Sequence, residues 1–325
     1  MHVFIDTNIL LNFFHFTKED IDALNDVFAS HEHGAAKVHL TQQVCEEFYR
    51  NRENKIKDAL KKFKDVKFVA QLPTFMKHYE EYEQIRQKSN ELQELAKSIS
   101  RKVDADVVSD SLLTDILIKD IFAKRNPIPT TIELFTKAQM RVSLGNPPGK
   151  NGSLGDCVNW IALLETVPDE ENLHVISEDG DYYSILDENR PHPFLSAEWE
   201  RQKKAKLLVY RTLSSFLKEH FDGIAFSYDK NKETLIQNLA VSGSFAITHH
   251  LISKLEQFGY FSMKEVQRIL AAALSNDQFG AIATDTDVYT FLKRVAVPRM
   301  GTLGDTEQIE FLQKTCNIQA LMGDV

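Results

Sequence analysis

Short runs of apolar residues are the first regular feature of the chain. Val3-Phe4-Ile5 is one such run, and residues 38–40, 173–177 and 207–210 form the others. Runs of this length, bounded by turn-forming residues, predict buried β-strands. Segments with apolar residues at the helical period separate them, so strands and helices alternate along this part of the chain. Such alternation predicts an α/β fold built on a mostly parallel sheet that helices cover on both faces.

Two other stretches show helical periodicity without any strand signal. After Pro73, apolar residues recur at near-heptad spacing as far as Ile99, and the helical pattern continues to Ile121. A helical stretch inside an α/β chain predicts an insertion, here at about residues 72–125. The second stretch begins near residue 229. We therefore expect an α/β domain over residues 1–222, which contains the insertion, and an all-α C-terminal region over residues 229–325.

The composition excludes several classes of protein. The 325 residues are 43% hydrophobic and 26% charged, values that are typical of folded globular domains. The three cysteines lack ligand spacing, so neither a disulfide framework nor a zinc site is expected, and a reducing cytoplasm is the natural setting. No uncharged apolar run approaches the ~20 residues that cross a bilayer. We therefore expect a soluble, cytoplasmic protein without a membrane partner.

The charges are unevenly distributed. The formal net charge of −9 argues against a protein that binds nucleic acid with its whole surface, so phosphate chains would have to meet local basic patches or bound cations. Residues 50–67, here called the basic strip, carry eight Lys and Arg against three Asp and Glu, a local charge of 8 − 3 = +5. Within the strip, Lys57, Lys61 and Lys64 are spaced by four and three residues and so share one face of a helix.

Acidic residues stand where predicted strands end and helices begin. Asp6 ends the first strand, Asp179 and Asp181 follow the strand at residues 173–177, and Asp156 opens a helix after a glycine-rich loop. In a parallel α/β sheet, the carboxyl ends of the strands lie at one edge and bind ligands. Carboxylates gathered there repel one another, and hard divalent cations prefer oxygen ligands. A Mg²⁺ or Mn²⁺ site is the simplest interpretation.

Four segments, taken in order, resemble the motifs of PIN-domain nucleases. They are Phe4-Ile5-Asp6-Thr7-Asn8-Ile9-Leu10-Leu11, then Val44-Cys45-Glu46-Glu47-Phe48-Tyr49-Arg50-Asn51-Arg52, then Pro147-Pro148-Gly149 leading to Gly155-Asp156 and Trp160, and last Ser177-Glu178-Asp179-Gly180-Asp181. The resemblance covers roughly residues 1–222 and is nearest to the PIN-like branch with a long helical insertion. It implies a doubly wound sheet and a metal-dependent nuclease that usually acts on RNA.

The resemblance also implies roles for individual residues. Asp6, Asp156 and Asp179 would form the catalytic, metal-binding cluster together with the glutamate of the second motif, and Asp181 would lie beside them as a further metal ligand. That glutamate is either Glu46 or Glu47, which point about 100° apart on a helix. We favour Glu47, because family members place this glutamate directly before a bulky apolar residue, as Glu47 stands before Phe48.

These interpretations predict hydrolysis by metal-activated water. A bound cation lowers the pKa of a water molecule so that hydroxide attacks the phosphodiester, and the basic strip would contact backbone phosphates. Asn8 would also support Asp6. The residues expected at the nucleic acid are Asn8, Arg50, Arg52, Lys57, Lys61 and Lys64. We expect an endoribonuclease for single-stranded RNA, and a toxin or defence role would fit bacterial PIN-like proteins by resemblance.

Other functions are weighed against this one. A catalytically silent nucleic-acid- or protein-binding module and a structure-specific DNA nuclease share the fold, although the complete acidic set favours an enzyme. Nucleotide hydrolysis is disfavoured because the loop from Gly145 lacks Ser or Thr after Lys150. A haloacid-dehalogenase-type phosphatase needs aspartate where this chain has Asn8. The C-terminal helical region is the candidate surface for a homo-oligomer or a protein partner.

Overall fold

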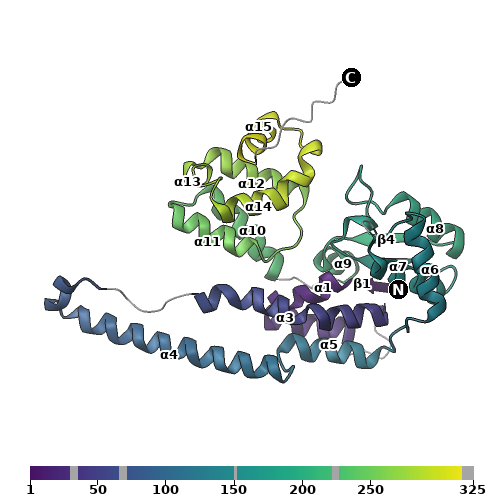
Figure 1. The fold of residues 1–325 in the computed structure, drawn as a ribbon, viewed down its shortest axis with the longest axis horizontal. Helices are drawn as coiled ribbons and strands as arrows, with labels where there is room; N and C mark the ends of the chain where they lie inside the picture. Colours follow the sequence, from purple (N-terminus) through teal and green to yellow (C-terminus); the bar gives the residue numbers. More distant parts are fainter. Residues whose placement is uncertain (30–35, 66–71, 150–151, 222–226, 317–325) are drawn as a thin grey trace. The chain divides into compact units, whose positions relative to one another are not determined.

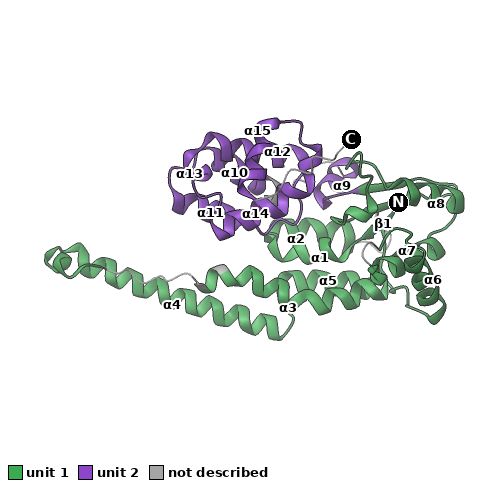
Figure 2. Cartoon of the chain, turned by 45° about the horizontal axis from the view of Figure 1, so that its top comes forward, with its two compact units in different colours: residues 1–209 green, residues 210–325 purple. Residues whose placement is uncertain are grey.

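The chain forms two compact units, residues 1–209 and residues 210–325 (Figure 2). The computed structural model describes residues 1–29, 36–65, 72–149, 152–221 and 227–316. Residue 222, the expected end of the α/β domain, lies outside these ranges, so the expected domain limits stay predictions. Among the described residues, none of the helices combines the length and the hydropathy needed to span a membrane.

The first unit is built on a four-stranded sheet with the strand order β2-β1-β3-β4. The strands are β1 (His2–Ile5), β2 (Lys37–His39), β3 (Leu173–Ile176) and β4 (Leu207–Tyr210). β1 pairs in parallel with β2 on one side and with β3 on the other. Every residue of β1 and β3 is buried, as their continuous apolar runs predict. The predicted α/β fold class is confirmed.

The strand order creates a switch point between β1 and β3. After β1 the chain forms β2 on one side, and it then returns to form β3 on the other side. The register pairs Ile5 with Ile176, and the amide of Asp6 donates to the carbonyl of Ile176 at 3.0 Å, so the two chains are still adjacent one residue beyond the strand. Ligands of α/β proteins bind at such a point, outside the carboxyl ends of the strands.

Helices surround the sheet of the first unit (Figure 1). They are α1 (Thr7–Asn12), α2 (Lys18–Leu24), α3 (Gln42–Asp65), α4 (Glu81–Val108), α5 (Leu113–Lys124), α6 (Ile132–Ser143), α7 (Leu154–Thr166) and α8 (Pro193–Lys203), with short helical turns η1 (Phe13–His15), η2 (Asn25–Ala29), η3 (Thr74–His78) and η5 (Gly180–Tyr182). A buried contact joins α3 to α7. The Thr41 hydroxyl accepts from the amide of Val44 at the start of α3 and donates to Oδ1 of Asn159 in α7 at 2.6 Å.

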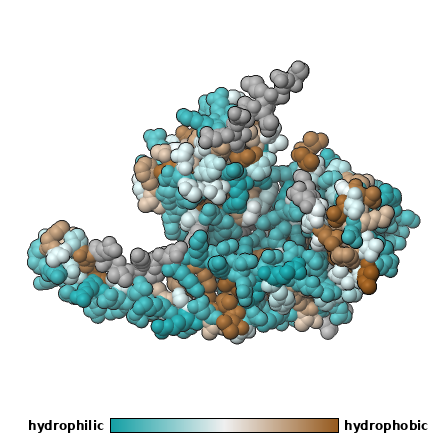
Figure 3. Space-filling model, in the orientation of Figure 1, coloured by the Kyte–Doolittle hydropathy of each residue, from teal (hydrophilic) through white to brown (hydrophobic). Residues whose placement is uncertain are grey.

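The predicted insertion consists of two helices with different surroundings. α4 has no buried residue and forms a long extension from the rest of the unit (Figure 1). Its face in Figure 3 is mostly hydrophilic. α5 instead buries Leu117, Ile118 and Ile121 and packs against α2 and η2. The inserted segment therefore contributes one helix to the core and presents one to solvent.

The second unit is helical, as predicted for the C-terminal region. Its helices are α9 (Leu213–His220), α10 (Ser227–Ala240), α11 (Phe245–Leu255), α12 (Met263–Ser275), α13 (Asp277–Gly280), α14 (Thr286–Ala296) and α15 (Thr306–Thr315), with the turn η6 (Val297–Thr302). Helices α10 to α15 share one core, in which the Phe261 ring packs edge-on against Phe258 and Phe291. A separate core of this size is consistent with a separate compact unit.

Two buried histidines join β1 to β2. Nδ1 of His2 lies 2.7 Å from Nε2 of His39, and the two rings stack. Burial lowers the pKa of His39 to about 4, and the nearby charges of His2, Lys37 and Arg125 lower it further in the same direction. The buried pair is therefore neutral at pH 7, and the proton is taken up more readily by the unfolded chain.

This pair predicts a loss of stability in acid. Because the folded pKa of His39 lies below the ordinary value of 6.5, its contribution is present above pH 6.5 and is lost as the pH falls toward 4. As the pH falls from 6.5 to 4, the parent should lose up to about 3 kcal/mol of its free energy of unfolding that the His39→Gln variant does not lose. Urea denaturation at a series of pH values measures the difference, and a gap that stays constant from pH 7 to pH 4 would contradict the assignment.

Candidate active site

Asp6 stands at the carboxyl end of β1, with only 6% of its surface exposed. Its Oδ1 accepts from the amide of Thr7 at 2.7 Å, and its Oδ2 accepts from Nδ2 of Asn8 at 2.8 Å and from the hydroxyl of Ser177. A carboxylate offers about four lone-pair positions. Three are occupied, so the group is rigidly held and Oδ1 keeps one position for a further partner.

Asn8 and Ser177 connect the end of β1 to the end of β3. Asn8 accepts from the amide of Glu178 through Oδ1 at 3.2 Å while its Nδ2 holds Asp6. The Ser177 hydroxyl also accepts from the amide of Asp179 at 3.0 Å. Asn8 thus supports Asp6 as expected. Both ends of its amide are engaged within the protein, and its expected contact with the nucleic acid stays a prediction.

Asp156 and Glu47 come from two helices that approach each other closely. Asp156 lies in the first turn of α7, where the helix dipole favours a negative charge. Gly155, the residue before Asp156, packs against the side-chain amide of Gln43 in α3. Gln43 in turn donates to Oε2 of Glu47 at 3.4 Å. The end of the Gln43 side chain therefore connects the start of α7 to Glu47.

The electrostatic environment separates Glu47 from its neighbour Glu46. The charge of Glu47 raises the pKa of both Asp6 and Asp156. Glu46 is exposed, accepts from Nε2 of Gln42 at 2.7 Å and lies 3.9 Å from Arg50. Glu47 thus faces the aspartates, whereas Glu46 points to solvent.

Asp179 and Asp181 lie on the turn after β3. Asp179 caps η5, since its Oδ1 accepts from the amide of Asp181 at 2.9 Å. Oδ2 of Asp181 accepts from the amide of Gly149 at 3.0 Å, which connects this turn to the glycine-rich loop before α7. Gly149 has a φ of +120°, and a Cβ there would lie 2.6 Å from the Cys157 sulfur. Only glycine fits this approach of the loop.

The carboxylates are close enough to perturb one another. Burial raises the pKa of Asp6 to about 7, and the charges of Asp156 and Glu47 add to the rise while the hydrogen bond from Ser177 opposes it. Burial likewise raises the pKa of Asp156 to about 6, helped by the charges of Asp179, Glu47 and Asp181. All five predicted acidic residues therefore belong to one electrostatic cluster, here called the acidic cluster: Asp6, Glu47, Asp156, Asp179 and Asp181.

The acidic cluster fits a hard divalent cation in its chemistry. Its donors are carboxylate oxygens, and a positive charge among them would relieve their repulsion. Two buried hydroxyls beside it, of Thr7 and Tyr182, lack a hydrogen-bond partner among the described residues. Burial raises the pKa of Tyr182, and the charges of Asp6, Asp156 and Asp179 add to this, which places its hydroxyl near the cluster. Such groups are suited to hydrogen bonding with ion-bound water.

The carboxylates of the acidic cluster are not arranged as a complete set of metal ligands. Within the described ranges, no three His, Cys, Asp or Glu residues form a ready metal-binding group. Asp156 instead hydrogen-bonds to the Ser153 hydroxyl, and Asp181 to the Gly149 amide. Cation binding would exchange these hydrogen bonds for coordination, while the better-held Asp6 would keep its position.

Arg52 requires a correction. It is expected at the nucleic acid, yet it is 5% exposed and forms two hydrogen bonds to the carboxylate of Asp115 in α5, at 2.7 and 2.6 Å. It also lies 3.0 Å from Asp110 and donates to the carbonyl of Val107. Arg52 therefore fastens the inserted helix α5 to α3, and it is unavailable to phosphates.

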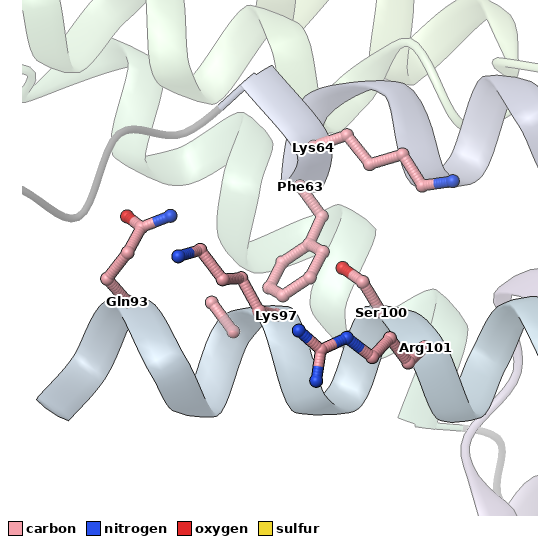
Figure 4. A pocket seen from close by; sticks show the side chains of 7 residues that line it. Phe63, Lys64, Gln93, Lys97, Ser100 and Arg101 are labelled. Carbon is pink, nitrogen blue, oxygen red and sulfur yellow. The ribbon is translucent and has the colours of Figure 1, made fainter.

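The four other cations of the basic strip that are expected at the nucleic acid lie at the surface. Arg50, Lys57 and Lys61 are exposed, and Lys64 forms an exposed ion pair with Asp104 at 2.9 Å. Such a pair contributes little to stability and can exchange for a phosphate. Lys64 also lines a groove of about 320 Å³ with Lys97 and Arg101 of α4. In Figure 4 the ring of Phe63 points from α3 toward α4 in this groove.

Several site residues are missed by sequence reasoning. Ser177 could have been found, because it is the last residue of a predicted strand beside that of Asp6. Tyr182 carries no signal, since a buried tyrosine is ordinary in any core. Lys55 is also missed: it donates to Oδ1 of Asn12, whose Nδ2 donates to Glu178 at 2.9 Å. This chain of contacts brings one lysine of the basic strip toward the end of β3.

The sequence of the chain matches one known protein family. A family model described as PIN domain matches residues 3–182, more than half of the chain and a range that includes the whole acidic cluster. No curated protein and no solved structure gives a significant match. PIN domains are generally nucleases and typically use divalent metals. With a parallel sheet, acidic residues at its switch point and a match of this extent, the chain belongs to the PIN-domain family.

Proposed function

We propose that the chain is a divalent-metal-dependent endonuclease that cleaves single-stranded RNA. One observation carries the proposal: five carboxylates from four separate segments meet at the switch point between β1 and β3, close enough to raise the pKa values of Asp6 and Asp156. A fold has no structural reason to gather repelling charges in this way. Perturbed acids in a crevice are a recurring feature of functional sites.

Each part of the site has a distinct task in this proposal. Asp6, Glu47, Asp156 and Asp179 would hold Mg²⁺ or Mn²⁺, and Asp181 would assist. The bound ion would supply an activated water and neutralise charge that develops on the phosphate. Asn8 and Ser177 fix the carboxylate of Asp6. The exposed lysines of the basic strip would hold the RNA backbone.

The finer assignments rest on the family. Single-stranded RNA as substrate, and a toxin or defence role, follow from resemblance to PIN-like proteins, and cleavage of structured DNA would use the same chemistry. A catalytically silent binding module is the second candidate. It is favoured by the hydrogen bonds that now hold Asp156 and Asp181. A cleavage assay separates these functions.

The first prediction for this site compares two neighbouring glutamates. In Mn²⁺, Asp6→Asn, Asp156→Asn and Glu47→Gln should each lower RNA cleavage by more than about 100-fold, since each removes a carboxylate that would hold the ion on which water activation depends. Glu46→Gln is the matched control and should stay within about threefold of the parent. Rates are measured on labelled single-stranded RNA and DNA, with circular dichroism to check folding.

A chelator should abolish the activity of the parent. Equal loss in Glu46→Gln and Glu47→Gln, or full activity of folded Asp6→Asn, would contradict the assignment of the acidic cluster. Cleavage of DNA that equals cleavage of RNA would replace the proposed substrate, and a folded parent that binds RNA without cleaving it would favour the silent module.

A second prediction concerns stability without metal. Since the folded pKa of Asp156 is raised from 3.8 to about 6, its contribution to stability is lost as the pH rises through this interval. Asp156→Asn should therefore unfold at a higher urea concentration than the parent at pH 8 in chelator, by about 1 to 3 kcal/mol. Adding Mn²⁺ should stabilise the parent and leave the variant nearly unchanged. A less stable variant in chelator would show that Asp156 mainly caps α7.

A third prediction concerns the basic strip. Replacing Lys57, Lys61 and Lys64 together by Ala should weaken RNA binding by a similar factor for unrelated sequences, and should flatten the slope of log affinity against log salt by up to about 0.7 per lost contact. Binding is measured by fluorescence anisotropy without divalent ions. A control triple variant of three exposed lysines elsewhere, Lys18, Lys230 and Lys254, removes the same charge. Equal slopes in the two triple variants would mean that the strip is only a solvated surface.

A further inference from the structure

Glu178 stands directly before Asp179 of the acidic cluster and is held at two points by one helix. Its Oε1 accepts from Nδ2 of Asn12, the last residue of α1, at 2.9 Å. Its backbone amide donates to Oδ1 of Asn8, near the start of α1, at 3.2 Å. Because both its side chain and its backbone are bound, the position and the direction of the chain that enters the turn after β3 are fixed together.

Asn12 is a buried amide between two charges. It is 5% exposed, and its Oδ1 accepts from Nζ of Lys55 at 2.9 Å while its Nδ2 donates to Glu178. The reverse orientation of the amide would place its NH₂ group against an ammonium and its oxygen against a carboxylate. Both hydrogen bonds involve a charged partner, which makes them stronger than neutral ones. The two charges therefore hold the amide in a single orientation.

Lys55 connects this contact to α3. α1 packs against α3, and Lys55 follows Glu47 by eight residues, about 12 Å along the same helix. Lys57 and Lys61 of the basic strip are exposed, whereas Lys55 is half-buried and donates to a buried side chain. α3 thus contributes to the site twice, with Glu47 in the acidic cluster and with Lys55 behind it.

From these contacts we infer that Asn12 and Lys55 are positioning residues of the acidic cluster. By way of Glu178 they hold the turn that carries Asp179 and Asp181. Neither residue touches the ion or the RNA in this role, which rests on the proposed function because that function places a divalent cation in the cluster. Side chains that hold metal ligands from behind typically change the affinity for the metal by about 10- to 100-fold when they are lost.

The sign of the effect on metal binding separates positioning from plain charge. Lys55 is a cation, so loss of its charge alone would strengthen the binding of Mn²⁺ to a nearby cluster. Loss of positioning has the opposite effect. Asn12→Asp likewise adds a negative charge that would attract Mn²⁺, yet it replaces the donor to Glu178 by a second carboxylate. The turn then loses its support, and binding weakens.

The test is a calorimetric titration of Mn²⁺ into the full chain at pH 8. Asn12→Asp and Lys55→Met should each weaken binding by about tenfold or more. In Asn12→Leu, which already lacks the amide, Lys55→Met should have little further effect. The decisive variant combines Asn12→Asp with Glu178→Gln, which exchanges the amide and the carboxylate at constant net charge. The new carboxylate accepts from Lys55 and from the new amide, so binding should return to within about threefold of the parent.

A control variant and a second measurement accompany the titration. Asn90→Asp adds the same charge at an exposed amide of α4 and should keep the affinity for Mn²⁺ within about threefold of the parent. Amide hydrogen exchange of residues 177–181, measured in chelator, needs no ion. It should be faster in folded Asn12→Asp and return to the parent rate when Glu178→Gln is added, while exchange in α12 of the second unit stays unchanged.

The outcomes distinguish positioning from the proposed function. Mn²⁺ binding in Asn12→Asp or Lys55→Met that equals or exceeds that of the parent would overturn positioning, and so would failure of Glu178→Gln to restore binding in folded Asn12→Asp. If metal-dependent RNA cleavage persists in that case, the proposed function stands without it. If the parent binds no Mn²⁺, the proposed function fails, and hydrogen exchange decides positioning by itself: an unchanged rate for the turn in Asn12→Asp overturns it.

Discussion

The arrangement of the first unit depends on a buried carboxylate at the end of β1. Asp6 is 6% exposed and receives hydrogen bonds from Thr7, Asn8 and Ser177. An ionised carboxylate in such a place is unfavourable unless donors or a positive charge compensate it. The donors come from the ends of both β1 and β3. The hydrogen bonds that compensate the charge of Asp6 therefore also hold the two strand ends together. Loss of either partner would disturb both the sheet edge and the site.

The hydrogen bonds compensate the buried charge of Asp6 only in part, and this bears on function. Even with three hydrogen bonds, burial and neighbouring acids raise the pKa of Asp6 to about 7 and that of Asp156 to about 6. The buried hydroxyls of Thr7 and Tyr182 lack partners among the described residues. Negative charge and unused polar groups together are what a hydrated cation would compensate, as the proposed function requires. Membership of the PIN-domain family, whose members typically use divalent metals, agrees with this interpretation.

The sequence was sufficient for features that depend on local pattern. Strands β1, β3 and β4 follow continuous apolar runs, and their order with the helices places Asp6 near Asp179. The structure adds what depends on distant packing. Arg52 looks like a surface cation in its helix, and only the return of α5 about sixty residues later buries it against Asp115.

The central claim is that buried, partly protonated carboxylates share one divalent cation. Because these groups must ionise to coordinate, binding should release protons. Calorimetric titration of Mn²⁺ at pH 6, repeated in buffers with different ionisation enthalpies, counts them. The account predicts one bound ion with release of about one proton in the parent, and loss of both in folded Asp6→Asn. Absence of Mn²⁺ binding by the parent, or the same binding and proton release in Asp6→Asn, would contradict it.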